Sequence, residues 1–258
     1  VKPKNAVSVS DDVKIKTYSG TSLIEIGNRV MEPYGNAYKN MKAYADALNR
    51  LKAEMPNTKA YCLMAPTAIE FYAPSKYNTG VSKSQYEGMC YIYEQLKDIT
   101  PVNAYAEMAA HTDEYLYFRS DHHWTTLGAY YAYRTFAKVA GFTPVDKNTL
   151  QTGKLSPFLG LFYKDTKSTA LSNDPDYVEY FIPPVNTTAS LGHRRRDEQQ
   201  LQHQSYQHRN DFVEQILSLC RRRPRRCQDN DRCTERQEHC CYQRELRKCL
   251  CTVALREL

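Results

Sequence analysis

Apolar and polar residues alternate with two different periods along the first quarter of the chain. Residues 14–18 and 23–26 are short alternating segments on either side of a Ser-Gly-Thr turn, a pattern typical of paired strands. Across residues 38–55 apolar side chains recur every three or four positions until a proline follows, which predicts an amphipathic helix. Residues 59–64 are apolar after an initial lysine, and we predict a buried strand there.

A second helix and a second strand follow in the same order. Residues 82–99 place apolar side chains on one helical face. Ser82 is the expected N-cap, and Gln85 then takes the third helical position, where a capping box has Glu or Gln. Beyond this helix, residues 102–105 predict a short strand and residues 106–110 a turn of helix.

The next strand-to-helix transition is the clearest in the chain. Residues 115–118 are strongly strand-like, and a polar segment follows them directly. Thr125 or Thr126 can cap the following helix, which we expect to end at Gly141. Residues 142–187 contain several prolines and few periodic signals, so an irregular lobe with one hairpin is expected. Strands that alternate with helices predict parallel βαβ units and therefore a layered α/β domain.

Composition divides the chain near residue 190. Up to that point there are 20 Lys+Arg against 19 Asp+Glu and 2 Cys, whereas residues 191–258 have 15 against 10 and 7 Cys. The nearly neutral first part implies no electrostatic attraction to nucleic acid. Because the tail has too few apolar residues to offset the entropy of ordering it, we expect a domain over residues 1–187 and a mostly disordered tail over residues 188–258.

Three interpretations of this tail compete. Its arginine blocks could bind phosphates as a nucleic-acid arm, but acidic residues are interleaved and base-stacking aromatics are scarce. Its cysteines could build a disulfide or zinc module, although their number is odd and no Cys-x-x-Cys pair is present. These cysteines are Cys220, Cys227, Cys233, Cys240, Cys241, Cys249 and Cys251. The third interpretation is that the tail is translated out of frame.

Codon degeneracy supports the out-of-frame interpretation. Residues 239–250 can be encoded so that a one-base shift reads Ile-Ala-Val-Ile-Lys-Glu-Ser-Tyr-Gly-Asn-Ala, which is a hydrophobic strand running into a turn. Residues 219–224 can be encoded so that the same shift reads Phe-Val-Gly-Gly-Asp. One shift explains both segments, and the coding DNA tests the hypothesis directly.

Asp121 and His123 are the strongest candidates for chemistry. They lie where a strand ends and a helix begins, the position at which open α/β sheets carry functional groups. Their spacing allows the Asp121 carboxylate to orient one ring nitrogen of His123, while the other nitrogen can take a proton from a serine hydroxyl. The spacing alone is also compatible with a capping aspartate, a surface histidine and a packed Trp124.

A metal ion is an alternative use of the same segment, because Asp121, His122 and His123 are all candidate ligands. Neighbouring histidines, however, point to opposite sides of an extended chain and rarely bind one ion together. We therefore expect no metal and no other cofactor at this site.

The sequence around Asp121 resembles a known signature. Residues 117–130, which contain Asp121-His122-His123-Trp124, resemble the motif of the bacterial DHHW proteins. Residues 27–32 and 65–67 also look family-like. This family is similar to the SGNH-hydrolase-like proteins that acetylate alginate and other exopolysaccharides, whose motif is Asp-x-His-Trp. The resemblance covers roughly residues 10–185.

The resemblance implies a three-layer α/β/α fold of the SGNH-like (flavodoxin-like) type, incomplete here at its C-terminal end. It also implies a Ser-His-Asp site in which Asp121 orients the imidazole, His123 is the general base and a serine follows later in the chain. That serine belongs to the Lys-Glu-Ser-Tyr-Gly-Asn segment recovered by the frame shift. The chain as it stands is therefore expected to be inactive and incompletely folded.

The function implied by the resemblance is that of an extracytoplasmic O-acetyltransferase or esterase. Its substrate would be a bacterial cell-wall or secreted polysaccharide, or a small acyl ester. The rival is a non-catalytic polysaccharide-binding or scaffolding protein with the same fold. No run approaches the ~18 apolar residues of a membrane span, and the chain is expected to be a segment without its signal or anchor.

Overall fold

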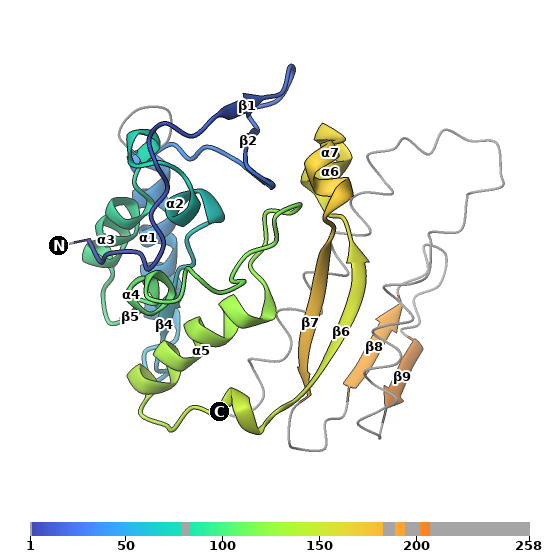
Figure 1. The fold of residues 1–258 in the computed structure, drawn as a ribbon. Helices are drawn as coiled ribbons and strands as arrows, with labels where there is room; N and C mark the ends of the chain where they lie inside the picture. The colour runs from blue at the N-terminus through green and yellow to red at the C-terminus, as the bar shows by residue number, and fades with distance from the viewer. Residues whose placement is uncertain (1, 79–82, 183–188, 194–201, 207–258) are drawn as a thin grey trace, which may run out of the picture. The chain divides into compact units, whose positions relative to one another are not determined.

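The structure divides into two compact units. It is a computed structural model that describes residues 2–78, 83–182, 189–193 and 202–206. The units are Val1–Phe181 and Ile182–Leu258, and their elements are labelled in Figure 1. Most of the expected out-of-frame tail lies outside the described residues, so its reading frame and its disorder stay predictions.

The first unit combines short strands with helices of very different lengths. In chain order its elements are β1 (Ile15–Thr17), β2 (Ile24–Ile26), β3 (Arg29–Met31), α1 (Tyr38–Glu54), β4 (Tyr61–Leu63), α2 (Ala68–Tyr72), η1 (Ser75–Asn78), α3 (Gln85–Gln95), β5 (Thr100–Val102), α4 (Tyr105–Ala109), α5 (Thr126–Ala140), η2 (Lys147–Thr149), β6 (Gln151–Phe158), α6 (Leu161–Thr166), α7 (Thr169–Asn173) and β7 (Asp176–Ile182).

An antiparallel sheet with the order β1–β2–β3 opens the unit. Ile15 lies opposite Ile26, and Ile24 lies opposite Met31. Gly27 has a φ of 61° in the two-residue turn between β2 and β3, a backbone conformation that favours glycine. The two strands predicted on either side of the first turn are confirmed. β3, which has three residues like β1 and β2, was not predicted.

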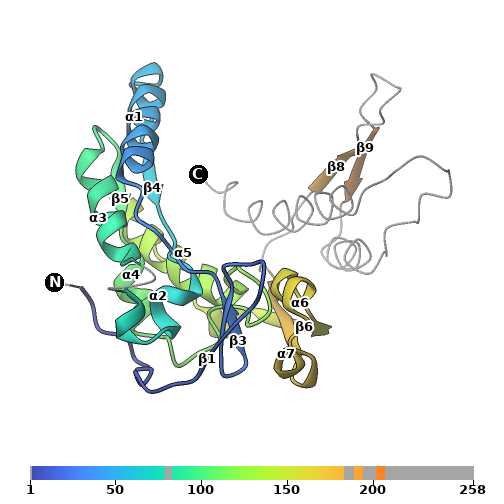
Figure 2. The same ribbon diagram turned by 90° about the horizontal axis from the view of Figure 1, so that it is seen from above.

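A parallel pair, β4 and β5, lies between layers of helices. Tyr61 of β4 is opposite Thr100 of β5. On one face the Cys62 thiol contacts the Tyr44 hydroxyl of α1, and on the other the ring of Tyr61 packs 5.3 Å from that of Phe136 in α5. Neighbouring side chains of a strand point to opposite faces, so helices cover both sides of the pair (Figure 2). This arrangement confirms the predicted α/β class.

Helix ends follow capping chemistry, with one correction. Ser84 caps α3 by accepting a hydrogen bond from the Glu87 backbone N–H at 3.4 Å. The expected cap, Ser82, lies outside the described residues. Thr125, one of the two expected candidates, caps α5, and Gly141 ends that helix with a φ of 88°.

The part of the chain after α5 is more regular than expected. β6 and β7 pair as a two-stranded sheet, with α6 and α7 between them in the chain. The prediction of an irregular lobe was wrong, because long-range aromatic packing rather than local periodicity orders this region. The ring of Phe158 lies 4.9 Å from that of Phe118, and the ring of Phe181 lies 5.9 Å from that of Tyr130.

The second unit is described at two strands. β8 (Ala189–His193) and β9 (Gln202–Tyr206) pair antiparallel, with Ala189 opposite Tyr206. Among the helices that the structure describes, none combines the length and the apolar character needed to cross a bilayer.

Candidate active site

The segment that carries Asp121 and His123 is a tight turn in front of α5. The strand predicted over residues 115–118 is reduced to a single antiparallel bridge between Tyr117 and Trp124. The prediction of a full strand was wrong, because the chain folds back on itself here instead of pairing along a neighbouring strand. The polar residues are therefore held at the tip of a short loop that α5 continues.

Asp121 and His123 form a close side-chain pair at this tip. The Oδ1 atom of Asp121 lies 2.6 Å from Nδ1 of His123 and also accepts the His123 backbone N–H at 3.1 Å. Its Oδ2 atom accepts the backbone N–H of Leu161 at 3.0 Å. The carboxylate is buried, whereas the His123 side chain keeps 20% of its surface exposed. The carboxylate is thus fixed from two sides and the imidazole remains accessible.

The hydrogen bonds decide the charge of Asp121. Burial alone would raise its pKa, but the hydrogen bonds from His123 and from the Leu161 backbone outweigh burial and lower the pKa below the ordinary 3.8. Asp121 is therefore ionised at neutral pH and draws the proton of His123 to Nδ1. This leaves Nε2 as the basic nitrogen of the ring.

A second carboxylate, Asp176 at the start of β7, holds the residues just before Asp121. Its side chain is fully buried and accepts the Ser120 N–H and hydroxyl at 2.7 and 2.6 Å. It also accepts the backbone N–H and Nε of Arg119, both at 2.9 Å, and the Tyr115 hydroxyl at 2.6 Å. Five donors from one short segment converge on this carboxylate, so Asp176 fixes the approach to the Asp121 turn.

Arg29 of β3 supports the same loop from another side. Its Nη1 atom donates to the backbone carbonyls of Tyr117 and Phe118, at 3.2 and 3.0 Å. The guanidinium also lies 4.2 Å from the centroid of the Tyr72 ring. Arg29, in the family-like segment of residues 27–32, therefore positions the loop that carries the candidate site.

Gly160 is tightly packed against the site, and a methyl group there would disturb it. A Cβ atom at this position would lie 2.4 Å from Cβ of Asp121 and 2.8 Å from the Ser120 carbonyl oxygen. We expect Gly160→Ala to destabilise the protein by about 1–3 kcal/mol, measured by urea unfolding with the fluorescence of Trp124, the single tryptophan. Gly35→Ala is the matched control, because a Cβ there meets nothing within 4 Å. Equal midpoints for both variants would contradict this account.

His122 lies beside His123 and not opposite it. The two ring centroids are 3.9 Å apart, because the backbone is turned rather than extended. The expectation that these side chains diverge was therefore wrong, and candidate ligand atoms of Asp121, His122 and His123 all lie within 4.8 Å of one another. The spacing of these atoms does not match a zinc site. Two ligands of a tetrahedral zinc with ~2.0 Å bonds are roughly 3.3 Å apart. The 2.6 Å contact between Asp121 and His123 is instead a hydrogen-bond distance, and the absence of a metal stays a prediction.

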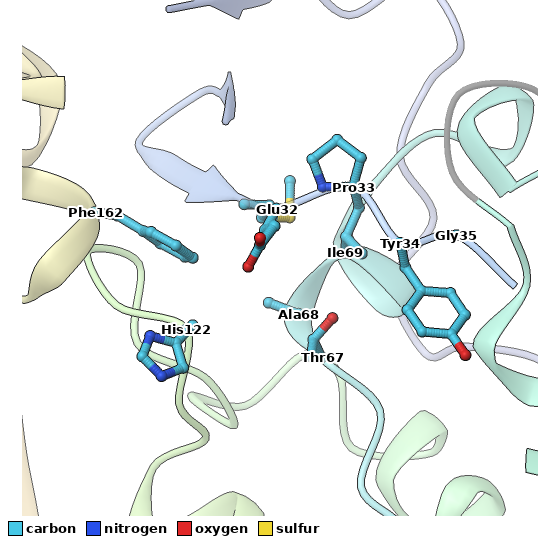
Figure 3. A pocket seen from close by; sticks show the side chains of 10 residues that line it. Glu32, Pro33, Tyr34, Gly35, Thr67, Ala68, Ile69, His122 and Phe162 are labelled. Atoms are coloured by element: carbon cyan, nitrogen blue, oxygen red, sulfur yellow. The ribbon is translucent and has the colours of Figure 1, made fainter. Parts of the chain in front are cut away.

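A cavity of about 210 Å³ is lined in part by His122. Figure 3 shows the Glu32 carboxylate pointing into it, with the rings of Phe162 and His122 on one side and Thr67 and Ala68 on the other. These residues come from the chain after β3, from the start of α2, from the Asp121 turn and from α6. Sequence reasoning missed the cavity, because it brings together four segments that are far apart in the chain.

Known proteins resemble this chain over a range that includes the Asp121 turn. The family model described as DHHW protein matches residues 7–199, and the chain belongs to this family. It is 30% identical to a DHHW family protein from Eubacterium siraeum of known crystal structure, with a TM-score of 0.62 over 69% of this chain and 59% of that one. A search of curated proteins finds no match.

Two further solved structures are more distant. Bacillus cereus PatB1 with a sulfonyl adduct is 15% identical, with a TM-score of 0.49 over 69% of this chain and 61% of that one. The O-acetyltransferase domain of Pseudomonas putida AlgJ is 15% identical, with a TM-score of 0.43 over 65% of this chain and 64% of that one. The chain thus spans less than two thirds of each of these three structures.

Proposed function

We propose that the intact protein is an acyl-ester enzyme of the SGNH-like class, an O-acetyltransferase or esterase that acts outside the cytoplasm on a bacterial cell-wall or secreted polysaccharide. The observation that carries the proposal is the 2.6 Å contact between Asp121 Oδ1 and His123 Nδ1 on a turn before a helix. Membership of the DHHW family supports the same motif. Asp121 would orient and His123 would act as general base.

The chemistry divides into two transfers. The basic Nε2 of His123 takes the proton of a serine hydroxyl while the serine oxygen bonds to the acyl carbon of an ester. The ester oxygen then leaves with the proton from His123. A second alcohol, or water, gives its proton to Nε2 while its oxygen bonds to the acyl carbon. The serine oxygen then leaves that carbon and takes the proton from Nε2, which restores the serine hydroxyl.

The serine comes, on this proposal, from the segment recovered by the one-base shift, which lies outside the described residues. Ser120 does not take this role, because its hydroxyl donates to Asp176 at 2.6 Å and accepts the Gly160 N–H at 2.9 Å. We also propose that residues 1–187 form the family domain and that the remainder is the out-of-frame tail. The chain as it stands should then show no esterase turnover.

The test is acetyl release from 4-nitrophenyl acetate by the protein translated from a frame-corrected gene. His123→Ala should abolish release, whereas His111→Ala, which changes a histidine stacked on the Tyr131 ring, should leave the rate unchanged. Equal rates in wild type and His123→Ala would favour the non-catalytic polysaccharide-binding alternative. Turnover by the uncorrected chain would refute the loss of the serine.

A further inference from the structure

The cavity lined by His122 has the size of a small polar ligand. Its 210 Å³ equals the liquid volume of about seven water molecules, which is comparable to one sugar ring. The ring centroid of His122, which lines the cavity, is 3.9 Å from that of His123. A ligand in the cavity would therefore contact His122, which separates it from the proposed general base, His123.

One polar group of the lining is held in place by a buried side chain. Gln85 was expected at the third position of a capping box but is the first residue of α3, and it binds Thr67 twice. Its Oε1 atom accepts the Thr67 backbone N–H at 2.8 Å, and its Nε2 atom donates to the Thr67 hydroxyl oxygen at 2.7 Å. The Thr67 hydroxyl accepts from Gln85, so its own proton remains to be donated to a ligand oxygen.

The other side of the cavity offers an acceptor and an apolar wall. The Glu32 carboxylate points into the space in front of the Phe162 ring (Figure 3). A carboxylate accepts strong hydrogen bonds from hydroxyl or ammonium groups, and an aromatic ring packs well against the C–H face of a sugar. Acceptor, donor and apolar wall together match a ring that carries several hydroxyls.

Among the acidic, lysine and arginine side chains, the described lining of the cavity has only the carboxylate of Glu32. Glu32 is exposed and brings a carboxylate to the lining, and no lysine or arginine is among the described residues that line the cavity. A carboxylate on the ligand would therefore meet a like charge without a compensating cation. Two charges of one sign about 4 Å apart at a protein surface repel strongly enough to lower affinity about tenfold or more.

On these observations we infer that the cavity binds one uncharged or amino-bearing sugar ring of the polysaccharide, and that Glu32 excludes uronic acids. This inference rests on the proposed function for its choice of ligand class. It deepens that function, because it selects among polysaccharides: chains of neutral or amino sugars are accepted, and chains of uronates are rejected.

The test is a binding titration by saturation-transfer NMR at pH 7 and low salt, with the full chain. The three ligands are the methyl glycosides of glucose, glucosamine and glucuronate, which share one ring and differ from the first at a single position, an amine at C2 or a carboxylate at C6. Glucuronate should bind at least about tenfold more weakly than methyl glucoside. In Glu32→Gln this difference should fall below about threefold, and glucosamine should lose affinity.

Two further variants control for charge and folding. Glu32→Asp keeps the carboxylate and should keep the discrimination. Glu54→Gln removes the same charge at the exposed end of α1 and should change nothing. Equal binding of glucuronate and methyl glucoside by wild type, no binding of any of the three sugars, or unchanged discrimination in Glu32→Gln would each overturn the inference. Binding needs no serine, so the result is independent of the ester assay.

Discussion

Replacing Asp176 by alanine should destabilise the protein by about 3–5 kcal/mol, the usual cost of leaving a buried ionic partner uncompensated. The side chain is completely buried and accepts five hydrogen bonds from Tyr115, Arg119 and Ser120. Its removal leaves these donors without their acceptor in a place that water does not reach. Urea unfolding followed by Trp124 fluorescence measures the loss directly, since this tryptophan forms the bridge with Tyr117.

Two further variants test whether the loss of stability comes from the buried charge of Asp176. Asp176→Asn keeps the size of the side chain but loses the charge and one acceptor, so it should give an intermediate loss. Asp174→Ala removes an exposed carboxylate that contacts the same Arg119 and should leave the unfolding midpoint nearly unchanged. If Asp174→Ala proved as damaging as Asp176→Ala, the importance given to the buried carboxylate would be mistaken.

Asp121→Asn should lower acetyl release by the frame-corrected protein roughly 10³–10⁴-fold, as expected when the carboxylate of a Ser-His-Asp site is lost. An amide cannot accept the His123 Nδ1–H and the Leu161 N–H as a carboxylate does. The imidazole would then take the wrong tautomer and present a protonated Nε2 to the serine. The ester assay measures this directly, and a rate within about tenfold of wild type would contradict the assigned role of Asp121.

The pH dependence of stability follows from the lowered pKa of Asp121. Its folded pKa lies below the ordinary 3.8, so the ionised side chain stabilises the native state above pH 3.8. This stabilisation is lost as the pH falls through the folded pKa. The difference in unfolding free energy between wild type and Asp121→Asn should therefore be constant near neutral pH and shrink in acid.

The sequence predicted the features that depend on residues close together in the chain, such as helix periods, helix ends and the Asp121–His123 contact. The helix over residues 38–55 shows its period and ends before a proline, and Thr125 and Gly141 mark both ends of α5. The contact between Asp121 and His123 was predictable, because two residues of separation suffice for it.

Long-range features escaped prediction for a physical reason. Asp176 follows Ser120 by 56 residues, and nothing in the local pattern connects them. The same holds for Gly160, whose missing side chain matters only because Asp121 packs against it. The strand expected over residues 115–118 failed differently. Its apolar residues are buried in the core, where Tyr117 packs against Phe71, so they have the pattern of a strand without pairing along a neighbouring strand.

The position of Asp176 also has a consequence for biosynthesis. A ribosome that has just completed the Asp121 turn has still to add α5, η2, β6, α6 and α7 before it reaches Asp176, the acceptor for Ser120 and Arg119. Until then the turn lacks its anchor, and the dyad is among the last parts of the unit to assemble. Nascent chains released early, or clipped between α5 and β7, would keep the Asp-His motif in their sequence and yet have no organised site.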